Sequence, residues 1–332
     1  MTKMVELLLL ATIFISFFCV LFVIPFWIRK ARQENLVGKD MNKLGERKVA
    51  EGGGVGVMFG FSIGVLLYLA INTFYFKKSD FLVSIFAILA TLFIATMLGS
   101  IDDLLGWKKG LSKSMRIVMM LFAAIPLMAI NAGESTLFGI DFGLFFPLFL
   151  IPLGIIGAST TFNFLAGYNG LEASQGILIL SALSIVTFLT GNSWLSVIAL
   201  CMVAALIAFY IFNKYPAKIF PGDTLTYPVG ALIAVIAILG NIEKIAVFFF
   251  IPYILETILK LRGRLRKESF AKLNKDGSLE IPYNKIYGLE HLAIKILKRI
   301  KPSKKVYETD VVYLINGFQI LIIFLGFWIF II

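Results

Sequence analysis

Long apolar stretches separated by short polar segments make up most of the pattern of hydrophobic and polar positions along the chain. A helix of about 20 apolar residues crosses a bilayer with its backbone hydrogen bonds satisfied, whereas irregular backbone does not. The pattern therefore predicts an all-α, polytopic integral membrane protein with about ten transmembrane helices. We expect these helices at residues 7–27, 55–76, 81–101, 117–130, 144–165, 174–190, 194–212, 225–239, 245–259 and 311–332.

The composition agrees with this class of protein. Of the 332 residues, 59% are hydrophobic and only 15% are charged, and the mean hydropathy is +0.91. A soluble domain would carry roughly 25% charged residues, which excludes a soluble enzyme, a disordered chain and a disulfide scaffold. Residues 1–332 are expected to form one transmembrane domain, whose first apolar stretch is too long for the core of a cleaved signal peptide. Cys19 and Cys201 lie inside apolar stretches, so neither a zinc site nor a disulfide is expected.

The basic residues are distributed unevenly between the two sides of the predicted helices. If all ten helices cross the membrane, 27 of the 31 Lys and Arg residues fall in the loops on one side, which are 28–52, 102–116, 166–173, 213–224 and 260–310. Cytoplasmic loops collect Lys and Arg, so we expect this side to be cytoplasmic and both termini to lie outside. The same bias explains the net charge of +11, and we do not expect nucleic-acid binding.

The longest hydrophilic segment, residues 260–310, contains a different helical pattern. Between residues 288 and 300, apolar side chains recur at helical spacing and basic side chains occupy the opposite face. This pattern predicts a basic amphipathic helix on the membrane surface, within a cytoplasmic loop. His291, the only histidine, falls on that helix, so neither a His-rich metal site nor a Ser-His-Asp triad is expected.

Acidic residues at helix ends are the first candidates for chemistry, because acids near the membrane are costly and mark functional sites. Asp102 and Asp103 close one predicted helix, where adjacent carboxylates repel each other unless a metal ion or nearby lysines compensate them. Asp223, in the Phe-Pro-Gly-Asp-Thr sequence of residues 220–224, opens another helix, and a helix N-terminus favours an anion. The alternatives are a solvated helix end for the Asp pair and a helix N-cap for Asp223.

A polar turn between two apolar helices supplies amide groups. Residues 163–172 contain Asn163, Asn169 and two flexible glycines, but no basic residue. Asn carbonyl oxygens suit a hard cation, and glycine lets the backbone approach a ligand closely. A plain Asn-Gly turn would explain Asn169 but not Asn163. Carboxylates, amides and clustered Lys and Arg on one membrane face together favour Mg²⁺ and phosphate chemistry.

These segments together resemble one family. Residues 102–103, 163–176 and 220–224 are similar to motifs of the membrane polyprenyl-phosphate N-acetylhexosamine-1-phosphate transferases. Residues 38–43, Gly-Lys-Asp-Met-Asn-Lys, and residues 51–55, Glu-Gly-Gly-Gly-Val, resemble segments of its eukaryotic and archaeal branch, the dolichyl-phosphate N-acetylglucosamine-phosphotransferases. The matches follow the family's order through most of the chain.

The resemblance implies a transfer reaction on the cytoplasmic face. N-acetylglucosamine-1-phosphate would pass from UDP-GlcNAc to a polyprenyl (dolichyl) phosphate, with release of UMP, as the first committed step of lipid-linked oligosaccharide assembly for N-glycosylation. The implied cofactor is Mg²⁺, with Mn²⁺ as a substitute. The implied partners are a UDP-sugar donor, a polyprenyl-phosphate lipid acceptor and the membrane, and the one protein partner considered is a second copy of the chain in a homodimer.

The resemblance also assigns roles to residues by motif position. Asp223 and Asn163 are implied to hold the metal ion against the diphosphate. Asp102 and Asp103 are implied to be catalytic residues at the acceptor phosphate, where they would orient it or take its proton. Lys113 best matches the family lysine that contacts the diphosphate.

The spacing after the Asp pair differs from the family pattern, so Lys109 and Arg116 are alternatives to that lysine. Phe220 is implied to stack on the uracil ring and Asn169 to read the uridine. The residues implied to bind substrate are Lys39, Asn42, Glu51, Asn169, Gly170, Glu172 and Phe220.

One segment departs from the family pattern. Animal and fungal members carry a His-Arg-x-Pro-Arg segment, which helps to recognise the sugar, before an Asn-x-x-Thr-Gly-Lys-Leu-Glu stretch. Residues 274–280 resemble the second part, but residues 264–270 contain neither His nor Pro. We expect Arg262, Arg264 and Arg266 to contact the sugar or the diphosphate instead, with binding of lipid headgroups as the alternative.

Two other functions remain as alternatives at this point. The nearer one is the same chemistry with another UDP-N-acetylhexosamine or an undecaprenyl acceptor. The more distant one is a secondary transporter, but the acids gather at one interface and no internal repeat is visible, whereas transporters place such groups near the bilayer midplane between repeats. The chain shows no ER retrieval tail and has lean outer loops, which favours an archaeal cell (plasma) membrane, or the ER membrane if the chain is eukaryotic.

Overall fold

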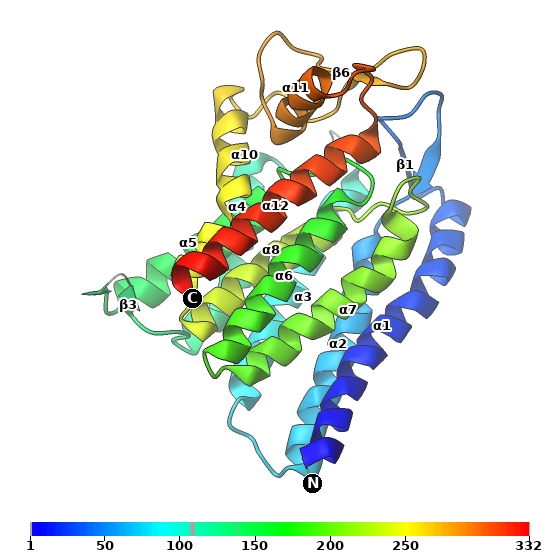
Figure 1. Cartoon of the computed structure of the whole chain (residues 1–332). Helices are drawn as coiled ribbons and strands as arrows, with labels where there is room; N and C mark the ends of the chain where they lie inside the picture. Colours follow the sequence, from blue (N-terminus) through cyan, green and yellow to red (C-terminus); the bar gives the residue numbers. More distant parts are fainter. Residues whose placement is uncertain (1, 107–109, 138, 332) are drawn as a thin grey trace.

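Helices account for 69% of the chain. The computed structural model describes residues 2–106, 110–137 and 139–331 (Figure 1). Its α-helices are α1 (Thr2–Gln33), α2 (Gly53–Ala70), α3 (Leu82–Leu105), α4 (Lys113–Ala129), α5 (Ile151–Phe162), α6 (Leu171–Leu189), α7 (Ser193–Asn213), α8 (Asp223–Gly240), α9 (Glu243–Phe249), α10 (Ile251–Arg262), α11 (Leu289–Ile300) and α12 (Glu308–Phe330). A π-helical segment extends α2 at its end (Ile71–Tyr75), and another precedes α5 (Phe146–Leu150).

Most helices match the apolar stretches of the sequence. Within the described residues, seven helices are long and apolar enough to cross a membrane, namely α1, α2 with its π-helical segment, α3, α6, α7, α8 and α12. Two shorter apolar helices, Ser114–Ala129 and Phe146–Phe162, lie at two of the remaining predicted stretches. The predicted helix 245–259 is divided between α9 and α10 at Phe250, because Pro252 has no N–H to continue the hydrogen bonds of α9. The all-α, polytopic membrane class is confirmed.

Helix α8 lies inside the bundle, where it packs against α3, α5 and α2. Glycines let two of these neighbours approach the backbone of its first turn. A Cβ atom at Gly99 of α3 would lie 2.4 Å from the carbonyl carbon of Asp223, and one at Gly54 of α2 would lie 2.4 Å from the backbone nitrogen of Leu225. No side chain fits at either position, so backbone packing of three helices fixes where Asp223 begins α8.

Short antiparallel hairpins occupy the polar segments. They pair β1 (Val37–Lys39) with β2 (Lys48–Ala50), β3 (Thr136–Leu137) with β4 (Ile140–Asp141), and β5 (Lys272–Leu273) with β6 (Leu279–Glu280). The first hairpin also reaches the segment before α8, since the N–H of Phe220 donates to the carbonyl of Ala50 at 2.8 Å. This contact places the 38–51 region beside the residues that lead into α8.

The polar elements β1, β6 and α11 gather at one end of the helices, and the N-terminus lies at the opposite end (Figure 1). Helix α11 covers the stretch for which the sequence predicts an amphipathic helix. Its Leu289 and Ile294 side chains join the hydrophobic core and His291 is fully buried, whereas Ile300 is 69% exposed. Its placement on a membrane surface stays a prediction.

Candidate active site

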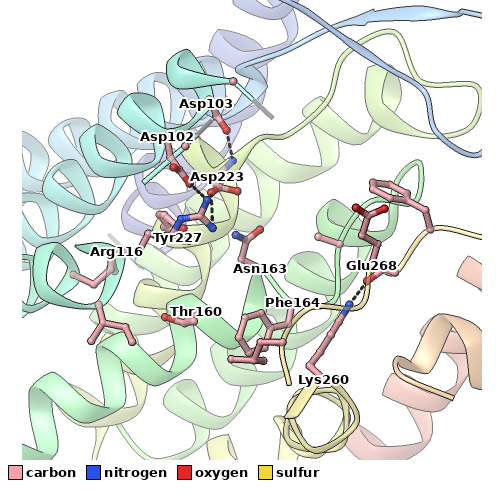
Figure 2. Close-up of a pocket in the computed structure, with 18 of the residues that line it drawn as sticks. Asp102, Asp103, Arg116, Thr160, Asn163, Phe164, Asp223, Tyr227, Lys260 and Glu268 are labelled. Atoms are coloured by element: carbon pink, nitrogen blue, oxygen red, sulfur yellow. Dashed lines mark hydrogen bonds and ion pairs between the residues drawn. The ribbon is translucent and has the colours of Figure 1, made fainter. Parts of the chain in front are cut away.

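Two adjoining cavities lie where the helix ends meet the polar loops. The large cavity, of about 570 Å³, is lined by α3, α4, α5, α8 and the connection between α10 and α11 (Figure 2). The small cavity, of about 220 Å³, is lined by the loop 38–41, the turn 163–172 and the segment before α8. Glu51, Asn163 and Asp223 line both cavities, so a single ligand that contacts these residues can extend into both.

Asp103 caps the helix that carries Asp223. One carboxylate oxygen of Asp103 accepts the backbone N–H of Asp223 at 2.8 Å, and the other accepts the N–H of Thr224 at 3.1 Å and its hydroxyl at 2.5 Å. The residue at the N-cap position itself is Gly222, which has no side chain to cap with. Asp103 therefore satisfies the first N–H groups of α8 from a distance of 120 residues in sequence, and the Asp223 carboxylate is not used as the cap.

Arg116 links the other two acids of the cluster. Its guanidinium contacts an oxygen of Asp102 at 2.7 Å and lies 3.9 Å from an oxygen of Asp223. The second oxygen of Asp102 accepts the backbone N–H of Leu111 at 2.6 Å, and the Asp102 side chain is only 2% exposed. The Asp223 side chain is 21% exposed, so it is the carboxylate of this pair that a ligand can reach.

Asn163 supplies an amide next to this carboxylate. It follows α5, and Figure 2 shows its side chain pointing toward the space in front of Asp223. Among the described residues, no three His, Cys, Asp or Glu side chains form a cage around a metal ion. Mg²⁺ usually takes only one or two carboxylates and completes its shell with water and substrate phosphates. The accessible carboxylate of Asp223 and the amide of Asn163 fit such an ion.

The small cavity brings together several of the residues that the sequence assigns to substrate. Its walls include Lys39, Asn169, Glu172 and Phe220. The Asn169 amide donates to a carboxylate oxygen of the buried Asp40 at 3.1 Å. The Glu172 carboxylate is fully buried and accepts the backbone N–H of Gly167 at 2.7 Å, which holds the turn in shape. The aromatic residues Tyr168, Phe220 and Phe270, together with amides and backbone groups, suit a planar heterocycle with polar edges.

Two of the predicted substrate residues have structural contacts and do not line either cavity. The Asn42 amide donates to the carbonyl of Gly167 at 3.2 Å and accepts from the N–H of Ala271 at 3.3 Å, so its polar groups join two loops. Gly170 has a φ of 84°, and a Cβ atom there would lie 2.9 Å from the ring of Tyr210. Only glycine fits this left-handed turn against the ring.

Glu51 stands between the two cavities. Its side chain lies against Gly38, and its own carbonyl accepts a hydrogen bond from the indole of Trp27 at 2.9 Å. Burial and the negative charge of Asp103 raise the pKa of Glu51 above its ordinary value. A carboxyl group that holds its proton more firmly can donate a hydrogen bond to a ligand oxygen.

The arginines expected at the sugar lie elsewhere. Arg262, Arg264 and Arg266 are exposed and do not line either cavity. Their neighbours Lys260 and Lys267 do line the large cavity. The same basic segment thus contributes positive charge to the cavity through these two lysines and not through the three arginines. The expected sugar contact of the arginines stays a prediction.

Three basic residues, Lys109, Lys113 and Arg116, are the candidates for contact with the diphosphate. Lys113 begins α4, and its side chain lies outside the described residues, as does the whole of Lys109. Arg116 lies one turn further along α4 and lines the large cavity beside Asp102 and Asp223. Of the three candidates, it is the one whose charge the structure places at the acids.

Comparison with known proteins shows the family of the chain. The model of glycosyl transferase family 4 matches residues 85–241. A Saccharolobus solfataricus protein, provisionally named UDP-N-acetylglucosamine–dolichyl-phosphate N-acetylglucosaminephosphotransferase, is 37% identical over 296 residues, which cover 87% of this chain and 88% of the relative. The chain belongs to glycosyl transferase family 4.

Other members of the family resemble the chain as well. A Dictyostelium discoideum protein of the same name, without the provisional mark, is 30% identical over 268 residues, or 67% of this chain and 64% of that protein. A phospho-N-acetylmuramoyl-pentapeptide-transferase of Halalkalibacterium halodurans is 28% identical over 271 residues, or 77% of this chain and 82% of that protein. The family model spans Asp102, Asp103, Asn163 and Asp223, so the acidic cluster lies inside the matched region.

Several residues that line the large cavity had no role assigned from the sequence, and three of them are Tyr227, Lys267 and Phe270. Tyr227 lies four residues after Asp223 in α8, so helical spacing alone could have placed both on one face. Lys267 lies in a run of basic residues, and no local feature of the sequence distinguishes it from the exposed arginines of that run. Phe270 lines both cavities, and a Cβ atom at Gly167 would lie 2.9 Å from its ring. No feature of the sequence around Phe270 indicates this contact.

Proposed function

We propose that this chain transfers N-acetylglucosamine-1-phosphate from UDP-GlcNAc to a polyprenyl phosphate and releases UMP. The observation that carries the proposal is the position of Asp223. Its carboxylate faces both cavities beside Asn163, while Asp103 takes over the capping of α8 and Arg116 lies 3.9 Å away. The names of the archaeal and Dictyostelium relatives support the donor and the acceptor, and family membership argues against the secondary transporter.

The two cavities suggest how the donor lies. The small cavity would take the uridine, with Phe220 at the base and Asn169 at its polar edge. The diphosphate would pass Asp223 and Asn163 into the large cavity, where Arg116 and Lys267 would face the phosphate oxygens. Mg²⁺, when bound at Asp223 and Asn163, supplies stabilisation of the negative charge that spreads over the diphosphate.

The reaction needs positioning more than it needs a strong base. An oxygen of the lipid phosphate attacks the β-phosphorus of UDP-GlcNAc, the bond from that phosphorus to the bridging oxygen breaks, and UMP leaves with the electron pair. A phosphate anion is already nucleophilic, so the main task of the protein is to hold two anions against their repulsion. The basic side chains of the large cavity serve this task, and Asp102 orients Arg116 toward it.

The membrane arrangement is part of the proposal. We propose that α4, the Phe146–Phe162 helix and the α9–α10 pair complete the seven longer helices to about ten spans. Both termini would then lie outside, and the cavities would face the cytoplasm, the side on which 27 of the 31 Lys and Arg residues fall. The protein would reside in the cell membrane, and a homodimer is the assembly considered for it.

The same chemistry with another sugar or lipid is the second candidate. The likeness to a bacterial phospho-N-acetylmuramoyl-pentapeptide-transferase favours it, as does the departure of residues 264–270 from the sugar-recognition segment. In that case an undecaprenyl phosphate or another UDP-N-acetylhexosamine would be used, with the same acids and the same leaving group.

The test is an assay of purified protein with a panel of UDP-sugars, several polyprenyl phosphates, and Mg²⁺ or Mn²⁺. We expect a GlcNAc-diphosphate lipid and an equal amount of UMP from UDP-GlcNAc, and neither product after chelation of the metal. A control with Asp223→Asn identifies activity from contaminating enzymes. Turnover of a different UDP-sugar in preference to UDP-GlcNAc would establish the second candidate, and product formation in EDTA would exclude the metal.

A further inference from the structure

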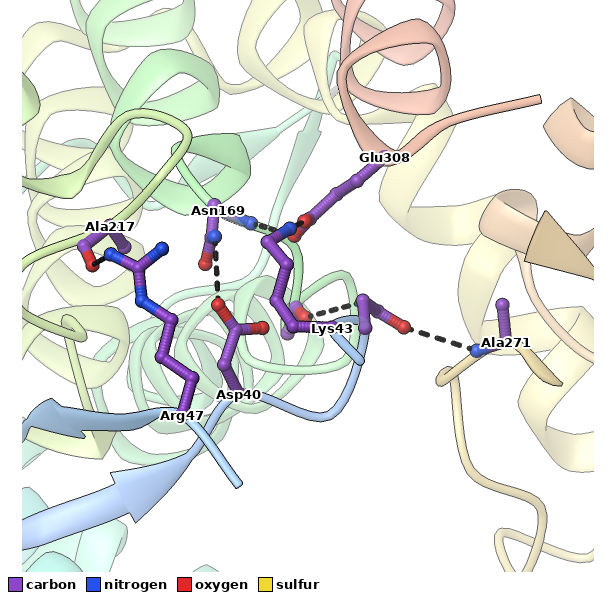
Figure 3. A network of polar contacts seen from close by, with 9 residues as sticks. Asp40, Lys43, Arg47, Asn169, Ala217, Ala271 and Glu308 are labelled. Carbon is purple, nitrogen blue, oxygen red and sulfur yellow. Dashed lines mark hydrogen bonds and ion pairs between the residues drawn. The ribbon is translucent and has the colours of Figure 1, made fainter. Parts of the chain in front are cut away.

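A buried ion pair stands directly behind the wall of the small cavity. Glu308, the first residue of α12, is 3% exposed, and its carboxylate pairs with the ammonium group of Lys43. The other oxygen of Glu308 accepts the backbone N–H of Asn169 at 2.7 Å. Neither Lys43 nor Glu308 lines either cavity, but Asn169 lines the small one (Figure 3).

The loop that carries Lys43 touches the same turn at other points. Asp40 accepts from the Asn169 amide at 3.1 Å, and the Asn42 amide donates to the Gly167 carbonyl at 3.2 Å. Lys43 itself lies over the ring of Tyr215, 3.9 Å from its centre. Figure 3 shows Asn169 between Asp40 of the 38–43 loop on one side and Glu308 of α12 on the other.

We propose that Lys43 and Glu308 are positioning residues for the nucleoside end of the donor, acting through Asn169. The inference rests on the proposed function, in which Asn169 reads the uridine. Glu308 holds the backbone of Asn169 while Asp40 holds its amide, so both the position and the rotation of this side chain are determined before a ligand arrives.

The role of Lys43 follows from the cost of burying a charge. An unpaired carboxylate in a buried site is strongly unfavourable, and it moves toward water or takes up a proton. Without Lys43, Glu308 would move toward water or take up a proton. Its hydrogen bond with the N–H of Asn169 would then weaken or be lost. The pair thus keeps a charged acceptor at a place where a single carboxylate would not be stable.

A purely structural role, in which the pair only anchors α12, makes different predictions. Lys301 and Asp310 form a second ion pair near the start of α12, at 2.7 Å, and neither touches a cavity. If the pair only anchored α12, loss of either ion pair would lower the thermal stability of the protein without changing its affinity for the donor. Lys301→Met is therefore the matched control for Lys43→Met.

The experiment compares Lys43→Met, Glu308→Gln and Lys301→Met in the full-length protein, measuring thermal unfolding, kcat, the KM for UDP-GlcNAc, and the inhibition constant of UMP. We expect Lys43→Met to raise the donor KM and the UMP inhibition constant about 10-fold, the loss expected for one charge-assisted hydrogen bond, with kcat within about 3-fold. Lys301→Met should leave both constants unchanged. Glu308→Gln keeps an oxygen for the Asn169 N–H and should show a smaller rise, so it tests the role even if Lys43→Met does not fold.

A charge exchange, Lys43→Glu combined with Glu308→Lys, separates the two roles. It restores an ion pair but places an ammonium group opposite the Asn169 N–H, so we expect recovery of thermal stability without recovery of the donor KM. Recovery of both, or an unchanged donor KM and UMP constant in Lys43→Met, would overturn the inference. A wild-type protein that forms no UMP from any UDP-sugar would instead refute the proposed function on which it rests.

Discussion

Two clusters of acidic side chains are built alike but differ in their access to solvent. In the first, Asp103 of α3 accepts the N–H groups at the start of α8, and Asp223 lies beside it. In the second, Glu256 of α10 accepts the N–H of Leu289 at the start of α11 at 2.6 Å, and Glu290 lies beside it. In each, a carboxylate from one helix caps a later helix whose first turn carries another acid.

The difference lies in what surrounds the second acid. The Asp223 side chain is 21% exposed and faces two cavities, whereas Glu256, Glu290 and the neighbouring His291 are fully buried. Burial and the nearby Glu256 carboxylate raise the pKa of Glu290 well above its ordinary value, and burial with the charge of Lys260 lowers that of His291 to about 4. Both shifts favour the neutral form of the group. A carboxylate that remains reachable can bind a cation, while a fully buried one is available only to partners within the fold.

The largest effect is expected at Asp223. Asp223→Asn keeps the size of the side chain and removes the charge, and since Asp103 supplies the cap of α8, folding should be retained. We expect turnover to fall by about 100-fold or more, because the metal stabilises charge throughout the transfer. Turnover of the folded variant across a Mg²⁺ titration checks this. The loss should be strongly non-additive with that of Asn163→Ala if both hold one ion, and near-normal turnover at ordinary magnesium would refute the role of ligand.

The two capping acids offer the most direct comparison. Asp103→Ala and Glu256→Ala each remove the acceptor at a helix start and should lower the free energy of unfolding by about 2 kcal/mol. Asp103→Ala should also lower turnover at least about 10-fold, because the backbone of Asp223 loses its fixed position. Glu256→Ala should keep turnover within about 3-fold. Thermal unfolding and initial rates give both quantities, and equal losses of activity would show that the second cluster also serves the reaction.

The fully buried cluster of Glu256, Glu290 and His291 is expected to make the stability of the protein depend on pH. Between pH 4.5 and the raised pKa of Glu290, the folded state holds a proton that the unfolded state releases, so stability falls as the pH rises, by up to about 1.4 kcal/mol per unit. Between about 4 and 6.5, His291 has the opposite effect, because the unfolded state holds the proton. Where the two ranges overlap, the two effects offset each other, and the decline comes from Glu290. Glu290→Gln should abolish that decline in thermal unfolding curves, and an unchanged slope would contradict the assignment.

The smallest effect is expected in the basic segment after α10. Lys267 lines the large cavity and Arg264 does not, although only two residues lie between them. Lys267→Met should raise the donor KM about 3-fold, the size of a partly screened charge contact, and Arg264→Met should leave it unchanged. The same assay with Arg262, Arg264 and Arg266 all changed to alanine tests the expected sugar contact. A raised KM or an altered sugar preference in the triple variant alone would favour the arginines.

Much of the fold could be predicted because its determinants are local. An apolar stretch of sufficient length forms a helix in a bilayer whatever its neighbours are, since its backbone has no other hydrogen-bond partner there. The stretches therefore located the helices, and the motif residues Asn163 and Asp223 do lie together at the cavities. The division of 245–259 at Phe250 was missed, although Pro252 was a local signal for it.

The contacts that decide the site are not local. Asp103 meets the start of α8 across 120 residues, and Glu308 meets Asn169 across 139. No periodicity or spacing specifies such partners, so the sequence could not show that Asp103 is a cap, that Asn42 joins two loops, or that Arg264 and Lys267 differ in access. The sequence by itself determined where the helices lie and which side chains are available for chemistry. Only the packing of α2, α3 and α8 decided which carboxylate a ligand can reach, because close backbone contacts assign each polar group either to a buried partner or to the cavity.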